Sequence, residues 1–188
     1  MPKVQIEQIS GADVLLAEFF EDERGGTTSL LTSLQHPKGH PSQILVTENT
    51  LKSTLRGMHL QRLDFPIHKY VSCIQGSIYD VIVDLRETSP TFKCWASVEL
   101  SEDNKKVLSI PNGVAHGYLT QTDEAKVFYL IIGERVAESE MVLSFADKDV
   151  GVTWPSLPMI LSEKDTLGSD LQTILKLIRV GNESPTNQ

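Results

Sequence analysis

The chain has 188 residues, of which 40% are hydrophobic and 22% are charged, and its formal net charge at pH 7 is −8. Such a length and balance are typical of a globular protein with a buried core, so one domain over residues 1–188 is expected. An acidic chain without a block of lysine or arginine is a poor binder of nucleic acid, and no apolar run is long enough to span a membrane. Any anionic ligand must therefore be held by a few placed cations.

Two further features concern the environment of the protein. The segment Met1–Gln5 carries no apolar signal, so a cytoplasmic location is expected. The two cysteines, Cys73 and Cys94, lie in apolar stretches typical of strands. Their spacing does not suit a metal site, and such cysteines are more often small buried hydrophobic residues than a disulfide.

The N-terminal part is predicted to mix short strands and turns. Residues 3–20 indicate a short alternating strand, a turn and an apolar strand-like run. Glu21–Gly26 is a charged turn with two glycines. Residues 29–36 are predicted as a short helix, and His36–Pro41 as a solvated loop because of its proline and glycine content.

From residue 43 to residue 153 the chain consists of short β-rich runs separated by turn residues. Many short strands at this spacing predict a β-sandwich or barrel rather than alternating β/α units. The predicted strands are Ile44–Val46, Tyr70–Cys73, Ser77–Asp84, Cys94–Leu100, Lys106–Ile110, Gly117–Thr120, Lys126–Ile132 and Met141–Phe145.

The C-terminal stretch 168–180 has helical periodicity, with apolar residues at positions i, i+3, i+4 and i+7. Ser169 is placed to cap this helix, and the polar residues 181–188 are expected to be frayed. The apolar residues are Leu171, Ile174, Leu175 and Ile178.

One stretch gathers residues that can perform chemistry. Arg56 and His59 flank Gly57-Met58, and Lys69 follows ten residues after the histidine. A cation, an imidazole and an amine on strands suggest a site that binds an anion and moves protons. Gly57 within a strand often marks a bulge or a close approach of two backbones. Taken alone, however, a strand histidine is more often a hydrogen-bonded structural residue, and the same holds for His116.

Three other candidates also have an ordinary structural interpretation. Lys69 could extend from a sheet edge into solvent, or it could face a cavity and hold a developing oxyanion. Tyr129 could be a core aromatic or a proton donor. Asp165 fits a helix-capping turn that begins at Ser162. No metal is expected, because a metal site on such a strand needs a His-x-His pair, and the second residue after His59 is glutamine.

Several segments occur together in an order and spacing that resemble the dTDP-4-dehydrorhamnose 3,5-epimerase family of nucleotide-sugar epimerases. The resemblance covers about residues 14–167 and implies a mostly β, cupin-type jelly-roll or barrel with a short C-terminal helix. It further implies a homodimer with a shared active site, working without a metal or other cofactor. The matching segments are Phe20–Gly25, Leu55–Gln61, Asp80–Arg86 with Ser89–Phe92, Ile110–Gly117, Val152–Pro155 and Leu161–Asp165.

The resemblance also implies roles for individual residues. His59 matches the general base and Asp165 the carboxylate that orients it. Tyr129 matches the acid on the other side of the sugar ring, and Lys69 would face the 4-keto oxygen. The residues implied in substrate binding are Arg24, Arg56, His116, Phe20, Asn49 and Gln61, of which Arg24 and Phe20 would come from the neighbouring subunit.

The function implied is inversion at carbon 3, carbon 5 or both of a dTDP- or CDP-linked 4-keto-6-deoxysugar, through an enolate, in deoxysugar biosynthesis. A cation near the ketone stabilises the enolate while an imidazole, which titrates near neutral pH, takes the proton. The alternatives are a single-carbon epimerase or keto-isomerase on a related sugar, and a non-catalytic nucleotide-sugar-binding cupin. The chain departs from the family pattern at Gly26–Ser29, at Thr47 and at Glu134-Arg135, where the family often has Tyr-Tyr.

Overall fold

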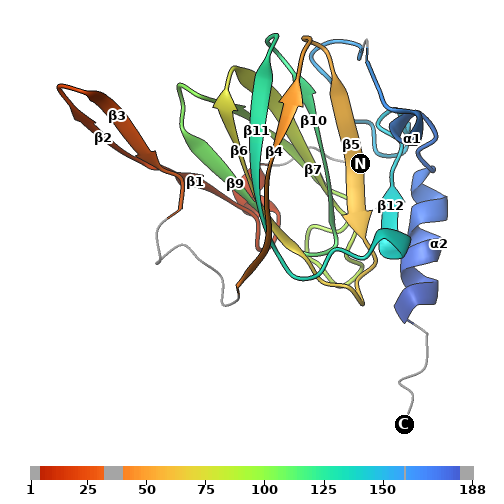
Figure 1. The fold of residues 1–188 in the computed structure, drawn as a ribbon. Coiled ribbons are helices and arrows are strands. Elements are labelled where there is room, and N and C mark those ends of the chain that lie inside the picture. The colour runs from red at the N-terminus through yellow and green to blue at the C-terminus, as the bar shows by residue number, and fades with distance from the viewer. Residues whose placement is uncertain (1–4, 32–39, 159, 183–188) are drawn as a thin grey trace.

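Alternation of inward and outward side chains along the strands builds two facing antiparallel sheets (Figure 1). The structure is a computed structural model that describes residues 5–31, 40–158 and 160–182. Sheet I has the order β1 (Asp13–Leu16), β9 (Lys106–Ile110), β6 (His68–Gln75), β11 (Ala125–Ile132) and β4 (Pro41–Asn49). Sheet II has the order β12 (Glu140–Val142), β5 (Leu55–Gln61), β10 (Val114–Thr120), β7 (Ser77–Asp84) and β8 (Trp95–Ser101). The arrangement is a cupin-type jelly roll, as the sequence predicts.

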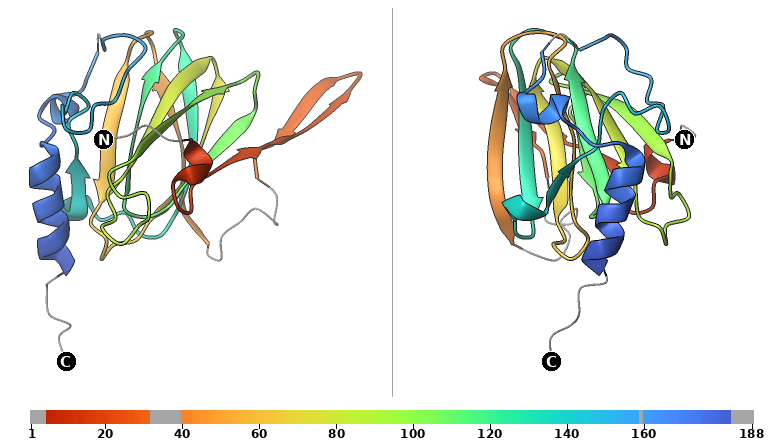
Figure 2. Two further views of the ribbon diagram at one scale, coloured as in Figure 1. Left: turned by 180° about the vertical axis from the view of Figure 1, so that it is seen from behind. Right: turned by 90° about the vertical axis from the view of Figure 1, so that its right-hand side faces the viewer.

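Two apolar layers stabilise this fold. Between the sheets, residues such as Val71, Ile82 and Val127 are fully buried. On the outer face of sheet II, the helix α2 (Leu171–Asn182) places Ile174 and its apolar neighbours against the strands (Figure 2). The predicted amphipathic helix is therefore confirmed, and sheet II is covered on both faces.

The remaining elements are short. They are the hairpin β2 (Glu18–Asp22) and β3 (Gly25–Ser29), the 3₁₀ turns η1 (Ile6–Gln8) and η2 (Ala137–Ser139), and the helix α1 (Glu163–Thr166). The hairpin extends away from the body of the molecule (Figure 1). None of the described helices is both long and apolar enough to cross a membrane.

Most predicted strands overlap observed ones, and Ser77–Asp84 and Lys106–Ile110 coincide with β7 and β9. The free cysteines are also confirmed, with Cys73 buried in the core. The last predicted strand was too long, because β12 ends at Val142; Leu143 still exchanges backbone hydrogen bonds with Met58 of β5 and bridges to Ser169, and the chain turns away after it.

Other details at the two ends were wrong. The first predicted strand is the turn η1 where it is described. Ser29 belongs to β3, and most of the helix predicted over 29–36 lies outside the described residues. Asp170 rather than Ser169 caps α2, since its carboxylate accepts a hydrogen bond from Thr173 N–H at 2.7 Å. That helix continues to Asn182, two residues past the predicted end, and residues 183–188 are not described.

A bulge at Gly57 shapes the strand that carries His59. His59 is paired with His116 on β10, but Arg56 is paired with Tyr118, so β5 has one residue more than its neighbour here. Gly57 has φ +127°, and a Cβ on it would lie 2.5 Å from the Cα of Gly117. In a regular strand, residues three apart face opposite sides. The extra residue lets Arg56 and His59 reach the same space between the sheets.

We expect Gly57→Ala to lower the free energy of unfolding by about 3 kcal/mol or more, since it adds backbone strain and a clash between two main chains. Gly25→Ala is the control, because Gly25 also has a positive φ, +118°, but its Cβ would meet no described atom within 4 Å. That variant should lose only about 1–2 kcal/mol. Urea unfolding measures both free energies. Equal losses in the two variants would show that a side chain between β5 and β10 destabilises the protein no more than backbone strain alone.

Candidate active site

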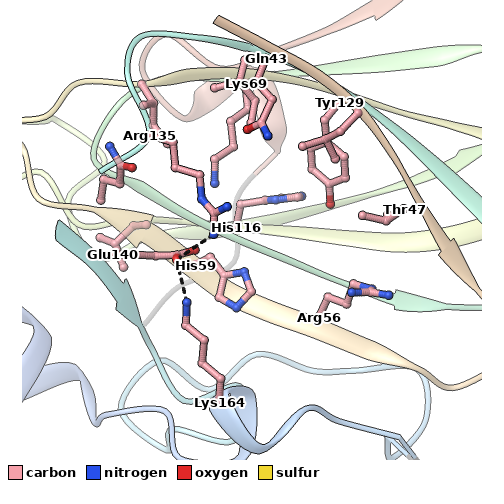
Figure 3. Close-up of a pocket in the computed structure, with 15 residues that line it drawn as sticks. Gln43, Thr47, Arg56, His59, Lys69, His116, Tyr129, Arg135, Glu140 and Lys164 are labelled. Atoms are coloured by element: carbon pink, nitrogen blue, oxygen red, sulfur yellow. Dashed lines mark hydrogen bonds and ion pairs between the residues drawn. The ribbon is translucent and has the colours of Figure 1, made fainter. Parts of the chain in front are cut away.

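A cavity of about 420 Å³ opens between the two sheets at one end of the barrel. Its walls come from β4, β6 and β11 of sheet I, from β5, β10 and β12 of sheet II, and from α1 (Figure 3). The polar residues that line it are Gln43, Thr47, Arg56, His59, Gln61, Lys69, His116, Tyr129, Arg135, Glu140 and Lys164.

His59 on β5 is paired with a carboxylate of α1. Its Nε2 lies 2.6 Å from Oδ1 of Asp165, which is 4% exposed. Ser162 caps α1 by accepting a hydrogen bond from Asp165 N–H, as the sequence predicts, and this fixes the aspartate. Burial raises the pKa of Asp165, but hydrogen bonds from His59 and Ser162 outweigh it, and the net pKa is lowered. The ionised carboxylate therefore holds the imidazole and favours Nε2 as its protonated nitrogen.

A second histidine–aspartate pair lies beside the first. His116 faces the cavity, and its Nε2 is 2.9 Å from Oδ2 of Asp80. Both side chains are almost inaccessible, at 4% and 0% exposure, whereas His59 is 29% exposed. Burial raises the pKa of Asp80, while the interaction with His116 opposes that rise. Of the two histidines, His59 is the one that a ligand can reach more readily.

The opposite wall carries Lys69 on β6 and Tyr129 on β11, adjacent strands of sheet I. Burial lowers the pKa of Lys69 to about 8, with Arg135 acting in the same direction and Glu140 opposing. Burial also raises the pKa of Tyr129 well above its ordinary value, and the neighbouring Tyr118 adds to the effect. The lysine can therefore supply a poorly solvated cation, and the phenol keeps its proton.

Arg56 stands at the rim of the cavity and is held in place by β4. Its Nε donates to Oδ1 of Asn49 at 2.8 Å, and a terminal nitrogen donates to the carbonyl of Glu48 at 3.2 Å. Asn49 is itself buried, donates to the carbonyl of Ala125 and does not line the cavity. The sequence assigned Asn49 to substrate binding, whereas the structure places it behind Arg56.

Gln61 lines the cavity, but the rest of the protein uses its amide. The side-chain nitrogen donates to the carbonyls of Phe65 and Glu134, and the oxygen accepts from Val136 N–H. The side chain is 3% exposed. These hydrogen bonds hold the two loops that contain Phe65 and Glu134. The amide is therefore better placed to support the loops than to contact the substrate, which was the role expected from the sequence.

Two expected site residues lie away from the cavity of their own chain. Phe20 and Arg24 belong to the projecting hairpin β2–β3 and do not line the cavity (Figure 1). Phe20 is 60% exposed, and the side chain of Arg24 is 84% exposed and contacts Asp22.

Sequence reasoning also missed several polar residues. Asp80 lies on the inward face of β7, between the core residues Ile78 and Ile82. A charged residue at a position that alternation assigns to the core indicates a buried polar site, and this signal could have identified Asp80 from the sequence. Arg135, Glu140 and Lys164 lie in loops or short elements and carry no comparable pattern. Within the described ranges, no three His, Cys, Asp or Glu side chains gather closely enough to hold a metal ion.

These features define a jelly-roll protein whose cavity brings a histidine, paired with a carboxylate, to face a lysine and a tyrosine. A family model described as dTDP-4-dehydrorhamnose 3,5-epimerase matches residues 7–173. The Escherichia coli K12 protein of that name is 35% identical over 175 residues, which cover 89% of this chain and 93% of that protein. The chain therefore belongs to the dTDP-4-dehydrorhamnose 3,5-epimerase family and is an isomerase.

Solved structures agree with this assignment. The dTDP-6-deoxy-D-glucose-3,5-epimerase of Legionella pneumophila, in complex with dTDP-4-keto-L-rhamnose, is 30% identical and superposes with a TM-score of 0.83. The match covers 94% of this chain and 95% of that one. A 3′-monoepimerase from Streptomyces bikiniensis, in complex with dTDP-quinovose, is 27% identical with a TM-score of 0.82, over 94% and 90% of the two chains.

The lowered pKa of Lys69 gives a testable dependence of stability on pH. Between pH 8 and the ordinary lysine pKa of 10.5, the unfolded chain binds more protons than the folded one, so this lysine makes stability rise with pH. At pH 7 the folded protein bears the full cost of burying the ammonium. Lys69→Met should therefore be more stable than the parent at pH 7, and this advantage should shrink by pH 9.5.

Urea unfolding at the two pH values measures the effect. Lys126→Met is the control, since Lys126 lies on β11 with its side chain 39% exposed, and its difference from the parent should be the same at both pH values. A Lys69→Met difference that also stays constant would contradict the burial of a charged amine.

Proposed function

We propose that the protein inverts carbons 3 and 5 of dTDP-4-keto-6-deoxyglucose by removing and returning protons next to the 4-keto group. One observation carries the proposal. His59, held by Asp165 of α1, lies on β5 of sheet II, whereas Lys69 and Tyr129 lie on sheet I, and these three side chains line the same cavity. The names of the related enzymes and the dTDP-sugars in the two solved complexes support a dTDP-linked substrate.

In this proposal His59 is the base. Asp165 accepts a hydrogen bond from Nε2, so the lone pair on Nδ1 takes the proton from the carbon next to the ketone. The electron pair of the broken C–H bond moves into an enolate whose oxygen becomes negative. Lys69 stabilises that oxygen as the charge develops, and its partial burial makes the interaction stronger than it would be in water.

Tyr129 delivers its own phenolic proton to the carbon from the other face, leaving a phenolate, while the proton taken by His59 stays on the imidazole; exchange with solvent then restores both groups. Its raised pKa keeps the phenol protonated through the neutral range, so it can donate but is a poor base. Because β11 and β5 lie in opposite sheets, the phenol and the imidazole approach a flat enolate from opposite sides. Removal on one side and delivery on the other inverts the carbon.

Arg56 and His116 are proposed to bind the diphosphate. Arg56 is fixed by Asn49 and Glu48 at the rim, and His116 extends the same wall on the next strand. In a protein with a formal net charge of −8, a placed cation such as Arg56 supplies local attraction for an anionic substrate, and the imidazole of His116 can add a hydrogen bond.

The proposed chemistry predicts isotope exchange. Incubated in D₂O with dTDP-4-keto-6-deoxyglucose, the protein should incorporate deuterium at carbons 3 and 5, which NMR can assign. Exchange at one carbon only would favour the single-carbon epimerase, an alternative supported by the likeness to the 3′-monoepimerase. If neither carbon exchanges, this sugar is not the substrate.

Variants separate the two proton-transfer roles in the same assay. His59→Ala should lower exchange by about 10²–10⁴-fold, since a positioned base is removed. His40→Ala is the control, because His40 is exposed and outside the cavity. Tyr129→Phe should reduce net inversion more than exchange, and an equal loss of both would count against Tyr129 as the opposite-face acid.

A homodimer that shares its active sites is also proposed. The hairpin β2–β3 projects from the body (Figures 1 and 2). Its side chains Phe20 and Arg24 are exposed. The edge strand β4, whose inward face lines the cavity, exposes Ile44 (62%) and Val46 (46%) on its outer face. A second copy covering this apolar edge could receive the hairpin at its own cavity. The expected cytoplasmic location stays a prediction.

Complementation tests this arrangement. Arg24→Ala and His59→Ala should each be nearly inactive, but co-expressed they should recover about a quarter of the parental activity. The reason is that half of the dimers are mixed and one of their two sites has both residues intact. Co-expression of His59→Ala with Asp165→Ala is the control and should recover nothing, since both residues belong to one chain's site. No recovery in the first mixture would show that Arg24 does not complete the partner's cavity.

A further inference from the structure

An ion cluster at one end of the cavity has no part in the proton transfers described above. Oε2 of Glu140 on β12 forms ion pairs with a terminal nitrogen of Arg135 at 3.1 Å and with Nζ of Lys164 at 2.7 Å (Figure 3). All three side chains line the cavity. Glu140 is only 15% exposed, whereas Arg135 and Lys164 are 55% and 50% exposed. The cluster is therefore anchored through the carboxylate and open to a ligand on its cationic side.

The position of Arg135 is fixed by its backbone. Gln61 donates to the carbonyl of Glu134 at 3.1 Å and accepts from Val136 N–H at 2.9 Å, so one buried amide holds the chain on both sides of Arg135. Just before, Gly133 has φ +97°, and a Cβ there would collide with the carbonyl oxygen of Pro66. A loop held at these points presents the guanidinium to the cavity at small entropic cost.

The cluster leaves both a donor and an acceptor available. Among the described residues, Arg135 uses its guanidinium in one hydrogen bond, to Glu140, although a guanidinium has five N–H donors. The hydrogen bonds to the Glu140 carboxylate from described residues all go to Oε2, which leaves Oε1 to accept another. A hydroxyl group, which both donates and accepts, is complementary to this pair.

The location of the cluster indicates which hydroxyl. Figure 3 shows Arg135 and Glu140 on one side of His59 and Lys69, and Arg56 on the other. Consider a substrate whose diphosphate lies at Arg56 and whose ketone lies at Lys69. The part of the sugar ring beside the ketone, which is remote from the diphosphate, would then point towards Arg135. In a 4-keto-6-deoxyhexose the carbons beside the ketone are 3 and 5, and only carbon 3 bears a hydroxyl. Carbon 5 bears the ring oxygen and the methyl group.

We propose that Arg135 and Glu140 form a clamp that binds the carbon 3 hydroxyl of the sugar and determines specificity for it. This inference rests on the proposed function and deepens it. Arg135 donates to the hydroxyl oxygen and Glu140 accepts the hydroxyl proton. Lys164, next to Asp165 in α1, donates to Oε2 of Glu140 and helps to hold the carboxylate in place. A sugar without that hydroxyl would leave the charged pair without its ligand, and such sites discriminate strongly.

Exchange at carbon 5 tests the clamp, because that carbon is unchanged in a 3-deoxy analogue. The two probes are dTDP-4-keto-6-deoxyglucose and dTDP-4-keto-3,6-dideoxyglucose, and the quantity is kcat/KM for deuterium incorporation at carbon 5. The parent protein should prefer the hydroxylated sugar by about tenfold or more. Arg135→Ala should lose most of that preference, mainly through a higher KM for the hydroxylated sugar, and Arg135→Lys should keep an intermediate preference because it retains the charge but not the planar fork.

Arg179→Ala is the matched control. Arg179 on α2 is 58% exposed, forms an ion pair with Glu87 and does not line the cavity, so its variant should keep the parental preference. Binding of dTDP alone should be the same in Arg135→Ala and in the parent, which shows that the variant is folded and that the nucleotide end is intact.

Two results would overturn the clamp, and they can be told apart. If Arg135→Ala exchanges carbon 5 with the parental preference, the clamp is wrong while the epimerase function stands. If the parent protein exchanges neither sugar, the proposed substrate is wrong and the clamp fails with it.

Discussion

The close approach of β5 and β10 at Gly57 and Gly117 is the constraint on which the site depends. It inserts one extra residue into β5, and this brings Arg56 and His59 to the same side of the sheet. A side chain at Gly57 would push the strands apart at the point where the two histidines are paired. The groups proposed to bind the anion and to accept the proton are thus placed by a backbone feature that contributes no chemistry of its own.

Burial then tunes the groups that the bulge and the strands bring together. The same loss of water that lowers the pKa of Lys69 raises that of Tyr129, because burial disfavours the charged form of each group. His59 and His116 both have an aspartate partner and line the cavity, but His59 is the more exposed of the two. Two chemically identical pairs therefore differ in how readily a ligand can reach the imidazole.

The fold could largely be predicted from the sequence, because alternation and turn residues directly reflect the pleat of a strand. The pairing of His59 with Asp165, 106 residues away, came only from the family resemblance, and the structure brings the two side chains into contact. Errors concentrated where local signals compete. Ser169 and Asp170 are both acceptable helix caps, and hydrogen-bond geometry selects Asp170.

The sequence by itself determined the jelly-roll class, the C-terminal helix and the set of residues proposed to transfer protons, since each depends on a local pattern or on the resemblance to the family. Only the tertiary structure decided which polar groups share the cavity. It placed Asn49 behind Arg56, used the amide of Gln61 within the protein, and moved Arg24 onto a projecting hairpin. It also gathered Arg135 and Lys164 around the carboxylate of Glu140. Alternation along a strand tells which face a side chain occupies, but its neighbours across the cavity depend on long-range register and on loops held by distant hydrogen bonds.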